Sequence, residues 1–561
     1  MNETEIPILK RILKMKIMLV FPPTTVYGDD PSVPPVVQPL GLAYLGAYLE
    51  QEGHEVNILD GRGAREDTTH TPTHTRFGIP DEEILRRVED FSPDVLGISN
   101  MYTAYSGDPH RIAKIIKERH PKLLIVFGGS HPSEFPELVM KDENVDMVVK
   151  GEGEITFSEL LKKIQNKKSF SEVLGLIYRD GERIIQNPPR DRMTDIDLLP
   201  LPARHLLPME QYINESMRHE FIMRKPAGAM VTSRGCPQKC VFCTVRAVWG
   251  RDWSGRNPSK VVDEIEFLQE KYNMREVSFL DDDLGRDIPR LAAICDEIIR
   301  RKVDIRWTTP NGVAHWLLNE NLLDKMKASG CYRLTFGIES GNKETRKFIK
   351  KKVPLEQATK MLSHANKIGL WTICTFILGF PYETKEQMRD SIRYAVDSGT
   401  DMAVFYLLLP HPTSDVYSVF KKEGLLDLDP IMDPTSYKQA EDFSEIGEVL
   451  SQRGAQTKYC SPEELQEMLT EAYKTFFKAR LKKWALNPVH FLRKVNSYED
   501  LKYTLKVGGA LADPIRKFLT VKRAHINMLW DKFNEKDAFS KARLYKSPEE
   551  ISENKSAAPL L

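Results

Sequence analysis

The sequence of 561 residues lacks several features that define specialised classes of protein. It has no run of 18 or more apolar residues, so we expect no transmembrane helix. Its first 14 residues contain no signal-peptide core or cleavage site, which predicts a cytoplasmic protein. Lys+Arg and Asp+Glu number 80 each, and this balance argues against a dedicated nucleic-acid-binding protein. With 41% hydrophobic and 29% charged residues and no repeat or low-complexity tract, the chain is typical of a globular protein.

Cysteine is scarce and unevenly distributed. There are seven cysteines, and three of them lie within eight residues. An odd number with such clustering does not suit the disulfide framework of a secreted chain. The pattern indicates a reduced protein with a metal site.

The first part of the chain alternates short apolar runs with helical segments. Strands are expected at residues 16–21, 55–60, 94–99, 123–127 and 146–150, with helices at 41–52, 111–119 and from 156 onward. Such alternation predicts an α/β domain over residues 15–165 with a doubly wound parallel sheet. Residues 1–14 form an N-terminal extension. The proline-rich residues 166–225 predict a linker with a small hairpin.

A second α/β series follows over residues 226–425. Six strands are expected, at residues 229–232, 276–280, 304–308, 333–337, 372–378 and 402–408, with helices between them. Six such units predict a partial (β/α)6 barrel of the TIM type, with its active site at the carboxyl ends of the strands. Residues 426–561 are expected to form a basic, helical C-terminal region that ends in a polar tail.

The strongest chemical signal is a cysteine cluster directly after the first barrel strand. Cys236, Cys240 and Cys243 have the spacing Cys-x3-Cys-x2-Cys. Three thiolates on one loop can hold three irons of a 4Fe–4S cluster and leave the fourth iron open to another ligand. A structural zinc site is the alternative, but zinc prefers four protein ligands. The other cysteines offer no convincing fourth ligand; they are Cys295, Cys331, Cys374 and Cys460.

This motif, with Phe242 before its third cysteine, resembles that of the radical S-adenosylmethionine (SAM) enzymes. The resemblance implies that the open iron binds the amino and carboxyl groups of SAM, with Phe242 beside the cofactor. It also implies a reductant such as ferredoxin or flavodoxin. One-electron reduction then cleaves SAM to methionine and a 5′-deoxyadenosyl radical, which removes a hydrogen atom from the substrate.

Three further segments resemble SAM-binding motifs of the same family. Residues 279–283 end the second barrel strand with three aspartates, and Asp282 is the expected contact. Residues 337–341 (Gly-Ile-Glu-Ser-Gly) resemble the fourth-strand motif, which implies that Glu339 faces the ribose hydroxyls beside Ser340. Gly379 belongs to a segment that resembles the fifth-strand glycine motif near the adenine. Each segment has an ordinary alternative: a helix cap, a structural hydrogen-bond acceptor or a turn.

The N-terminal domain resembles cobalamin-binding domains. Ser99 ends one expected strand, and Gly128 and Gly129 end the next, where small residues admit the nucleotide tail of cobalamin. Gly151 and Glu152 follow the fifth strand, and a Gly-Glu-Gly-Glu segment there is frequent in this group. The cobalt-ligating pattern Asp-x-His-x-x-Gly is missing after the first strand. A domain that kept the fold and lost cobalamin is therefore the alternative.

Together the two resemblances cover roughly residues 15–425. They imply a cobalamin-dependent radical SAM enzyme, most consistent with a methyltransferase that acts on an unactivated carbon of a small molecule. One alternative is a radical cyclase or carbon–carbon coupling enzyme. Another is a non-catalytic corrinoid or iron–sulfur binding protein.

The C-terminal region has a local excess of positive charge, although the whole chain is neutral. Residues 471–535 contain 14 Lys/Arg and 6 Asp/Glu, with aromatic residues such as Phe476 and Trp484 between them. A basic amphipathic stretch of this kind can lie on an anionic membrane, which would suit a lipid or tetrapyrrole substrate. We prefer the alternative of a helical cap that packs on the barrel.

Overall fold

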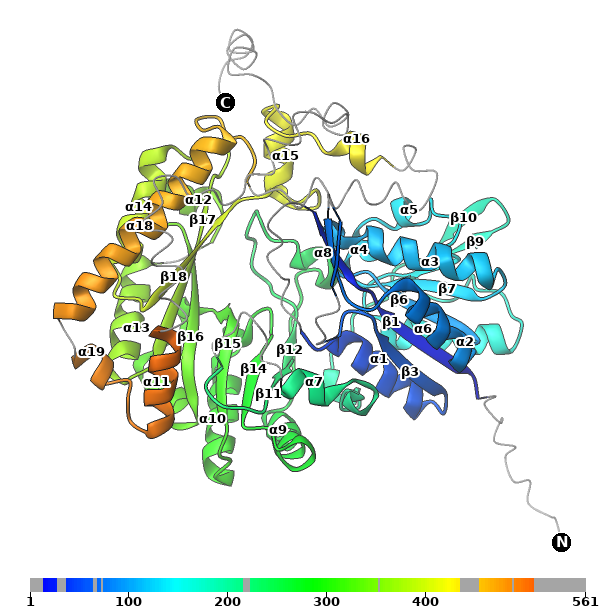
Figure 1. Cartoon of the computed structure of the whole chain (residues 1–561), viewed down its shortest axis with the longest axis horizontal. Helices are drawn as coiled ribbons and strands as arrows, with labels where there is room; N and C mark the ends of the chain where they lie inside the picture. Colours follow the sequence, from blue (N-terminus) through cyan, green and yellow to red (C-terminus); the bar gives the residue numbers. More distant parts are fainter. Residues whose placement is uncertain are drawn as a thin grey trace.

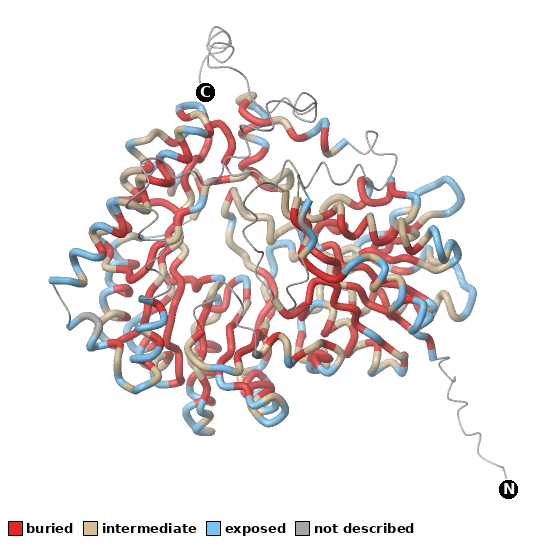
Figure 2. Tube along the Cα trace, viewed as in Figure 1, coloured by how far each residue is buried: buried red, intermediate tan, exposed pale blue. Residues whose placement is uncertain are grey.

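The computed structural model of the chain describes residues 14–27, 37–63, 68–71, 74–214, 222–351, 354–433, 454–486 and 489–508. It contains two α/β units that lie side by side, each built on a parallel sheet (Figure 1). The strands at the centre of each unit are almost entirely buried (Figure 2).

The N-terminal unit has a seven-stranded sheet with the order β10-β9-β8-β7-β6-β1-β3. Five of its strands are parallel: β1 (Lys16–Phe21), β3 (Glu55–Asp60), β6 (Val95–Ser99), β7 (Leu124–Gly128) and β8 (Met147–Val149). The predicted hairpin consists of β9 (Leu176–Asp180) and β10 (Arg183–Gln186), and it extends this sheet in antiparallel fashion. The helices are α1 (Leu40–Gln51), α2 (Asp81–Phe91), α3 (Gly107–Arg119), α4 (Ser130–Glu134), α5 (Pro136–Val139) and α6 (Gly153–Gln165).

Several elements of this unit were not predicted from the sequence. They are α2, α4, α5 and a small antiparallel sheet of β2 (Thr24–Tyr27), β4 (Thr68–His70) and β5 (His74–Phe77). These short strands are rich in Thr and His and lack the alternation of apolar and polar residues that marks a strand. Their side chains are ordered by long-range contacts, such as the hydrogen bonds that Thr25 makes to Asp108.

The second unit is an open, fully parallel six-stranded barrel in chain order. Its strands are β11 (Ala227–Met230), β14 (Glu276–Phe279), β15 (Arg306–Val313), β16 (Cys331–Glu339), β17 (Trp371–Leu378) and β18 (Met402–Leu407). Between them run α9 (Pro258–Tyr272), α10 (Ile288–Arg301), α11 (Glu320–Ala328), α12 (Lys343–Phe348), α13 (Leu355–Lys367) and α14 (Lys385–Asp397). The predicted fold class, a doubly wound domain followed by a partial barrel, is confirmed.

Several shorter elements accompany these units. They are α7 (Met209–Asn214), β12 (Ser233–Arg234), α8 (Val245–Trp249), β13 (Ser254–Gly255), α15 (Asp415–Lys422), α16 (Asp429–Met432) and α19 (Val489–Leu492).

The C-terminal region contains α18 (Pro462–Leu486), which packs on α14 and β18. Phe476 is buried, and the Tyr473 ring lies 5.4 Å from the Phe405 ring of β18. The aromatic residues of this helix therefore face the barrel, as expected of a helical cap. No helix within the described residues is both long and apolar enough to cross a membrane. The predicted tail, residues 537–561, lies outside the described residues.

A buried ion pair fixes Lys494, which follows α19, to the barrel. Lys494 and Asp401 are both fully buried and lie 2.6 Å apart, and the Lys494 ammonium also donates to the Leu370 carbonyl. Removing one partner of a buried pair leaves an uncompensated charge. We predict that Lys494→Met lowers the free energy of unfolding by about 3–5 kcal/mol. Chemical denaturation checks this value, and the control Lys502→Met, which changes an exposed lysine, should differ from the wild type by less than about 0.5 kcal/mol.

Candidate active site at the junction of the two units

The cysteine loop, residues 236–243, follows β11 and β12 at the carboxyl end of the barrel's first strand. Cys236, Cys240 and Cys243 are half-buried on this loop, and no three His, Cys, Asp or Glu side chains of the described residues, these thiols included, converge closely enough to hold a metal ion. Burial raises the pKa of Cys236 to about 12 and that of Cys240 to about 11. Iron binding must therefore displace these thiol protons. Three thiols on one loop match the donor set of a site-differentiated 4Fe–4S cluster. The other four cysteines are buried elsewhere in the fold.

The three aspartates that end β14 have different surroundings. Asp281 is buried and accepts hydrogen bonds from the Thr232 amide, the Thr232 hydroxyl and the Ser233 hydroxyl. Its carboxylate therefore ties the end of β14 to the start of the cysteine loop. Asp282 is exposed and accepts a hydrogen bond from the Gly235 amide at 3.2 Å. Asp283 lies 3.8 Å from the Cys236 sulfur, and burial raises the pKa of its carboxyl to about 6.

Glu339 is held by a lysine that the sequence analysis did not identify. Glu339 ends β16 with φ +64°, and its carboxylate lies 2.6 Å from the Lys351 ammonium. Lys351 also lowers the pKa of Cys240 and Cys243, against the larger opposing effect of burial. A Cβ atom on Gly337 would lie 2.7 Å from both the Glu339 carboxylate and the Lys351 ammonium, so a larger residue would displace this pair. The glycine of the motif therefore makes room for a buried ion pair beside the cysteine loop.

The remaining predicted SAM contacts lie at the same end of the barrel. Ser340 is buried, with its hydroxyl 3.2 Å from that of Ser391. Gly379 has φ +90°, and a Cβ there would meet the Leu465 side chain at 3.3 Å. Phe242 is half-buried, and its ring centroid lies 6.2 Å from that of Phe380, the residue after Gly379. Phe242 thereby connects the cysteine loop to the glycine turn after β17.

The carboxyl edge of the N-terminal sheet carries the predicted cobalamin residues. Ser99 and Gly128 end β6 and β7 as register partners. A Cβ on Gly128 would meet only the Val149 carbonyl, at 4.0 Å, and one on Gly151 would meet nothing within 4 Å, so both glycines border open space. Gly129 has φ +112°, and a Cβ there would lie 2.7 Å from the Asn100 carbonyl oxygen. The glycines therefore leave backbone rather than side chains at this edge. A ligand that binds at the strand ends needs such access to the backbone.

Several buried polar atoms near this edge have no hydrogen-bond partner within the described ranges. They are both side-chain polar atoms of Asn100, the Ser106 hydroxyl and Nε2 of His131. Met101 and Tyr102 follow Asn100 and expose large apolar side chains. An edge with unpaired polar atoms and exposed apolar groups fits a large amphipathic cofactor such as cobalamin.

Two histidines of this unit are fully buried. His110 lies in α3 and pairs with Asp142 at 2.7 Å. This helix begins four residues earlier than expected, at Gly107, which places His110 on the face that packs on the sheet. His131 is also fully buried, in α4, and bonds the Thr103 hydroxyl through Nδ1.

The segments on both sides of the cysteine loop contact this unit, and Figure 1 shows α8 beside α4. After the loop, α8 contacts α4, the helix that follows Gly129. Before the loop, Arg234 forms ion pairs with Glu152 and Glu154 in the segment after β8. The carboxyl ends of the two sheets therefore meet at one junction. Glu152, expected to contact cobalamin, has protein partners here: Arg234 and the Met193 amide.

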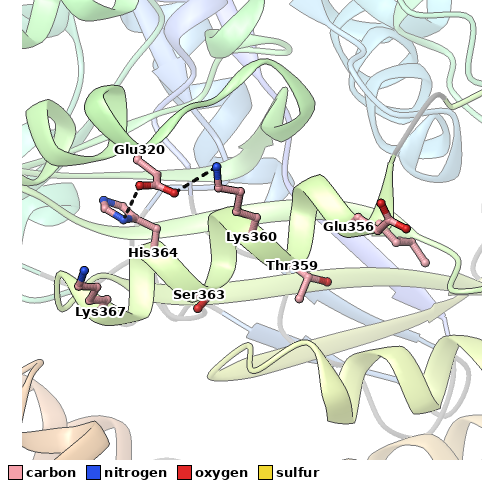
Figure 3. Close-up of a pocket in the computed structure, with 8 residues that line it drawn as sticks. Glu320, Glu356, Thr359, Lys360, Ser363, His364 and Lys367 are labelled. Atoms are coloured by element: carbon pink, nitrogen blue, oxygen red, sulfur yellow. Dashed lines mark ion pairs between the residues drawn. The ribbon is translucent and has the colours of Figure 1, made fainter.

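A groove on the outer face of the barrel lies apart from this junction (Figure 3). It is bordered by α11 and α13, and Glu320 bridges Lys360 and His364 within it. None of its lining residues belongs to the cysteine loop or to the predicted cofactor contacts.

A barrel with this cysteine loop, beside a parallel sheet with a glycine-lined edge, defines a radical SAM enzyme with a cobalamin domain. A family model described as B12 binding domain matches residues 31–161, and one described as Radical SAM superfamily matches residues 230–395. An uncharacterized methyltransferase of Pyrococcus horikoshii is 34% identical over 74% of this chain and 88% of its own length. Cytidylyl-2-hydroxyethylphosphonate methyltransferase of Streptomyces wedmorensis is 30% identical over 76% of this chain and 85% of its own length.

The chain therefore belongs to the family of radical SAM enzymes with a B12-binding domain. A structure of the radical SAM methyltransferase TsrM from Kitasatospora setae, with cobalamin and a 4Fe–4S cluster bound, has the same fold; its TM-score is 0.61 at 18% identity, over 83% of this chain and 89% of that one. The predictions of the family, of a radical SAM methyltransferase and of its three cofactors are confirmed. Anaerobic magnesium-protoporphyrin IX monomethyl ester cyclases, the group behind the cyclase alternative, are less similar, at 24–26% identity.

A buried carboxyl at the glycine turn gives a pH-dependent prediction. Glu383 accepts hydrogen bonds from the Gly379 and Phe380 amides and the Thr345 hydroxyl, and burial raises its pKa to about 7. The folded state therefore keeps a proton that the unfolded state releases, and this contribution to stability is lost as pH rises from about 4.5 to 7. Glu383→Gln keeps an acceptor oxygen and does not titrate.

We predict that the free energy of unfolding of Glu383→Gln, taken relative to that of the wild type, increases by about 1–3 kcal/mol from pH 5 to pH 8. Chemical denaturation of both proteins at the two pH values measures this change. If the difference in free energy of unfolding between variant and wild type is the same at pH 5 and pH 8, the Glu383 carboxyl is ionised in the folded protein at both pH values.

Proposed function

We propose that this chain transfers a methyl group to an unactivated carbon of a small organic molecule bound at the junction of its two units. The observation that supports this most directly is the contact between the cysteine loop and the carboxyl edge of the N-terminal sheet, through α8 and Arg234. Two cofactors bound at these places would lie close to each other, as a reaction that uses both requires.

The proposed roles follow from the positions of the side chains. Cys236, Cys240 and Cys243 would hold the cluster, with SAM on its open iron, and Glu339 would bind the ribose. When bound, the cluster and SAM supply the radical that removes a hydrogen atom from the substrate, and cobalamin supplies the methyl group. The protein aligns these groups and excludes water.

The other SAM contacts are proposed around the same barrel end. Gly379 lets the backbone approach the adenine closely, and Phe242 packs between the cysteine loop and that turn. Asp282 and Ser340 complete the set. Asp282 is exposed at its strand end, whereas Ser340 supports the turn after Glu339 by accepting a hydrogen bond from the Asn342 amide.

For cobalamin, Ser99, Gly128, Gly129 and Gly151 form the proposed crevice at the ends of β6, β7 and β8. Gly128 and Gly151 border its open space, and Gly129 allows β7 to approach the segment after β6. Glu152 would act indirectly, by holding Gly151 in place through its bond to Arg234.

The substrate is proposed to be a small molecule. The Streptomyces wedmorensis relative is named for a cytidylyl phosphonate, which is a polar, anionic compound. A lipid or tetrapyrrole substrate, contact with a membrane through the C-terminal region, a cytoplasmic location and a ferredoxin or flavodoxin reductant stay predictions of the sequence.

The cluster assignment predicts the behaviour of a single substitution. Anaerobically reconstituted wild-type protein should bind about four irons per chain and, with SAM and dithionite, release 5′-deoxyadenosine. Cys236→Ala should lose the cluster and release none, because the remaining two thiolates cannot retain it. The matched control Cys460→Ala changes a buried cysteine outside the loop and should keep both properties. Full iron content in Cys236→Ala would contradict the assignment.

The cobalamin assignment is tested at Gly128. We predict that Gly128→Val folds normally, because its side chain enters open space, but binds hydroxocobalamin at least about tenfold more weakly, since the side chain fills the crevice. Absorption titration measures binding, and thermal unfolding checks the fold. The control Gly41→Ala, on α1, also adds a Cβ with no neighbour within 4 Å and should bind normally. Unchanged binding in Gly128→Val would place the corrinoid elsewhere.

A further inference from the structure

We propose that Arg234 couples the cobalamin-binding edge to the cysteine loop, so that occupation of one site strengthens binding at the other. This inference rests on the proposed function. It adds a positioning residue that belongs to neither set of cofactor contacts.

Arg234 is a buried cation with partners on several sides. Its Nη1 donates to Glu152 at 2.8 Å and its Nη2 donates to Glu154 at 2.6 Å. Its guanidinium carbon lies 5.5 Å from the Tyr44 ring centroid and 5.6 Å from that of Trp249. Buried, charge-assisted bonds to two carboxylates fix the plane and direction of the guanidinium.

These partners come from both sides of the junction. Glu152 and Glu154 lie at the start of α6, directly after Gly151 at the proposed cobalamin crevice. Tyr44 belongs to α1 of the same unit. Trp249 ends α8, which follows Cys243, whereas Arg234 itself stands two residues before Cys236. One side chain therefore contacts the crevice segment and both flanks of the cysteine loop.

The backbone between Arg234 and Cys236 has little freedom to absorb a displacement. Gly235 has φ +88°, and a Cβ there would lie 2.2 Å from the Asp252 carbonyl oxygen. Its amide is bonded to Asp282, and β12 is paired with β13. A shift of the segment after β8 would therefore pass to Cys236 through Arg234.

A second arginine reinforces the connection. Arg192, from the segment between the two units, donates to the Arg234 carbonyl at 3.4 Å and lies 4.0 Å from Glu152. Its guanidinium is 5.3 Å from the Trp249 ring centroid. Arg234 and Arg192 therefore both contact Trp249 on the barrel side and Glu152 on the side of the N-terminal sheet.

Coupling between the two sites has a measurable consequence, because each bound cofactor must change the affinity for the other. If ordering of the cysteine loop by the cluster favours the bound arrangement of the crevice, the cluster must raise the affinity for corrinoid, and corrinoid must raise cluster retention by the same factor. Coupling of this kind is typically about 5- to 150-fold. We expect hydroxocobalamin to bind at least about fivefold more tightly to cluster-loaded protein than to the chelator-stripped form.

The test compares that ratio between variants, by anaerobic absorption titration of both forms of each protein. Arg234→Met keeps much of the side-chain volume and removes the charge, so its ratio should fall to about one while the protein still binds iron. Arg234→Lys keeps the charge but loses the planar bidentate geometry, so its ratio should be intermediate. The matched control Arg301→Met removes another arginine that is paired with several carboxylates, on α10, and should keep the wild-type ratio.

The outcomes separate this inference from the proposed function. If wild-type protein binds no corrinoid, the proposed cobalamin site is wrong. If it binds corrinoid with the same affinity in both forms, or if Arg234→Met keeps the wild-type ratio, the coupling is refuted and the site remains. Should Arg234→Met fail to fold, Glu154→Gln replaces it. That variant keeps Arg234 and an acceptor oxygen, and a wild-type ratio in it would equally refute the coupling.

Discussion

Everything in this structure that bears on function depends on the contact between the carboxyl ends of two parallel sheets. Parallel strands place their reactive loops at one edge, so a single sheet can present only one such edge. Here the barrel's edge carries the cysteine loop and the N-terminal sheet's edge carries the glycines. The ion pairs of Arg234 and the packing of α8 on α4 keep the two edges together.

Around that contact, buried ionisable side chains are arranged to hold the backbone in place. Asp281 ties two strand ends together, Glu383 closes the glycine turn, and Lys351 pairs with Glu339. A buried carboxylate or ammonium is tolerated only with such partners. The barrel end is therefore ordered in part by its own hydrogen bonds and ion pairs, which hold several of the proposed cofactor contacts in place.

The sequence predicted what depends on local pattern. The spacing of Cys236, Cys240 and Cys243, the alternation of strands and helices, and the glycines at strand ends are all read from neighbouring residues. Residues whose partners are distant were missed. Lys351 lies twelve residues after Glu339 and belongs to no motif, and Arg234 finds its carboxylates 80 and 82 residues away. The buried pair of His110 and Asp142 was missed for the same reason.

The functional assignment depends on whether a methyl group reaches a carbon of the substrate. The most direct measurement is product analysis by mass spectrometry, with reconstituted protein, hydroxocobalamin, a reductant and methyl-deuterated SAM added to a small-molecule extract. The account predicts a new product that carries the label on carbon, together with 5′-deoxyadenosine. A product that gains no label while 5′-deoxyadenosine forms would contradict it and favour radical cyclisation or coupling.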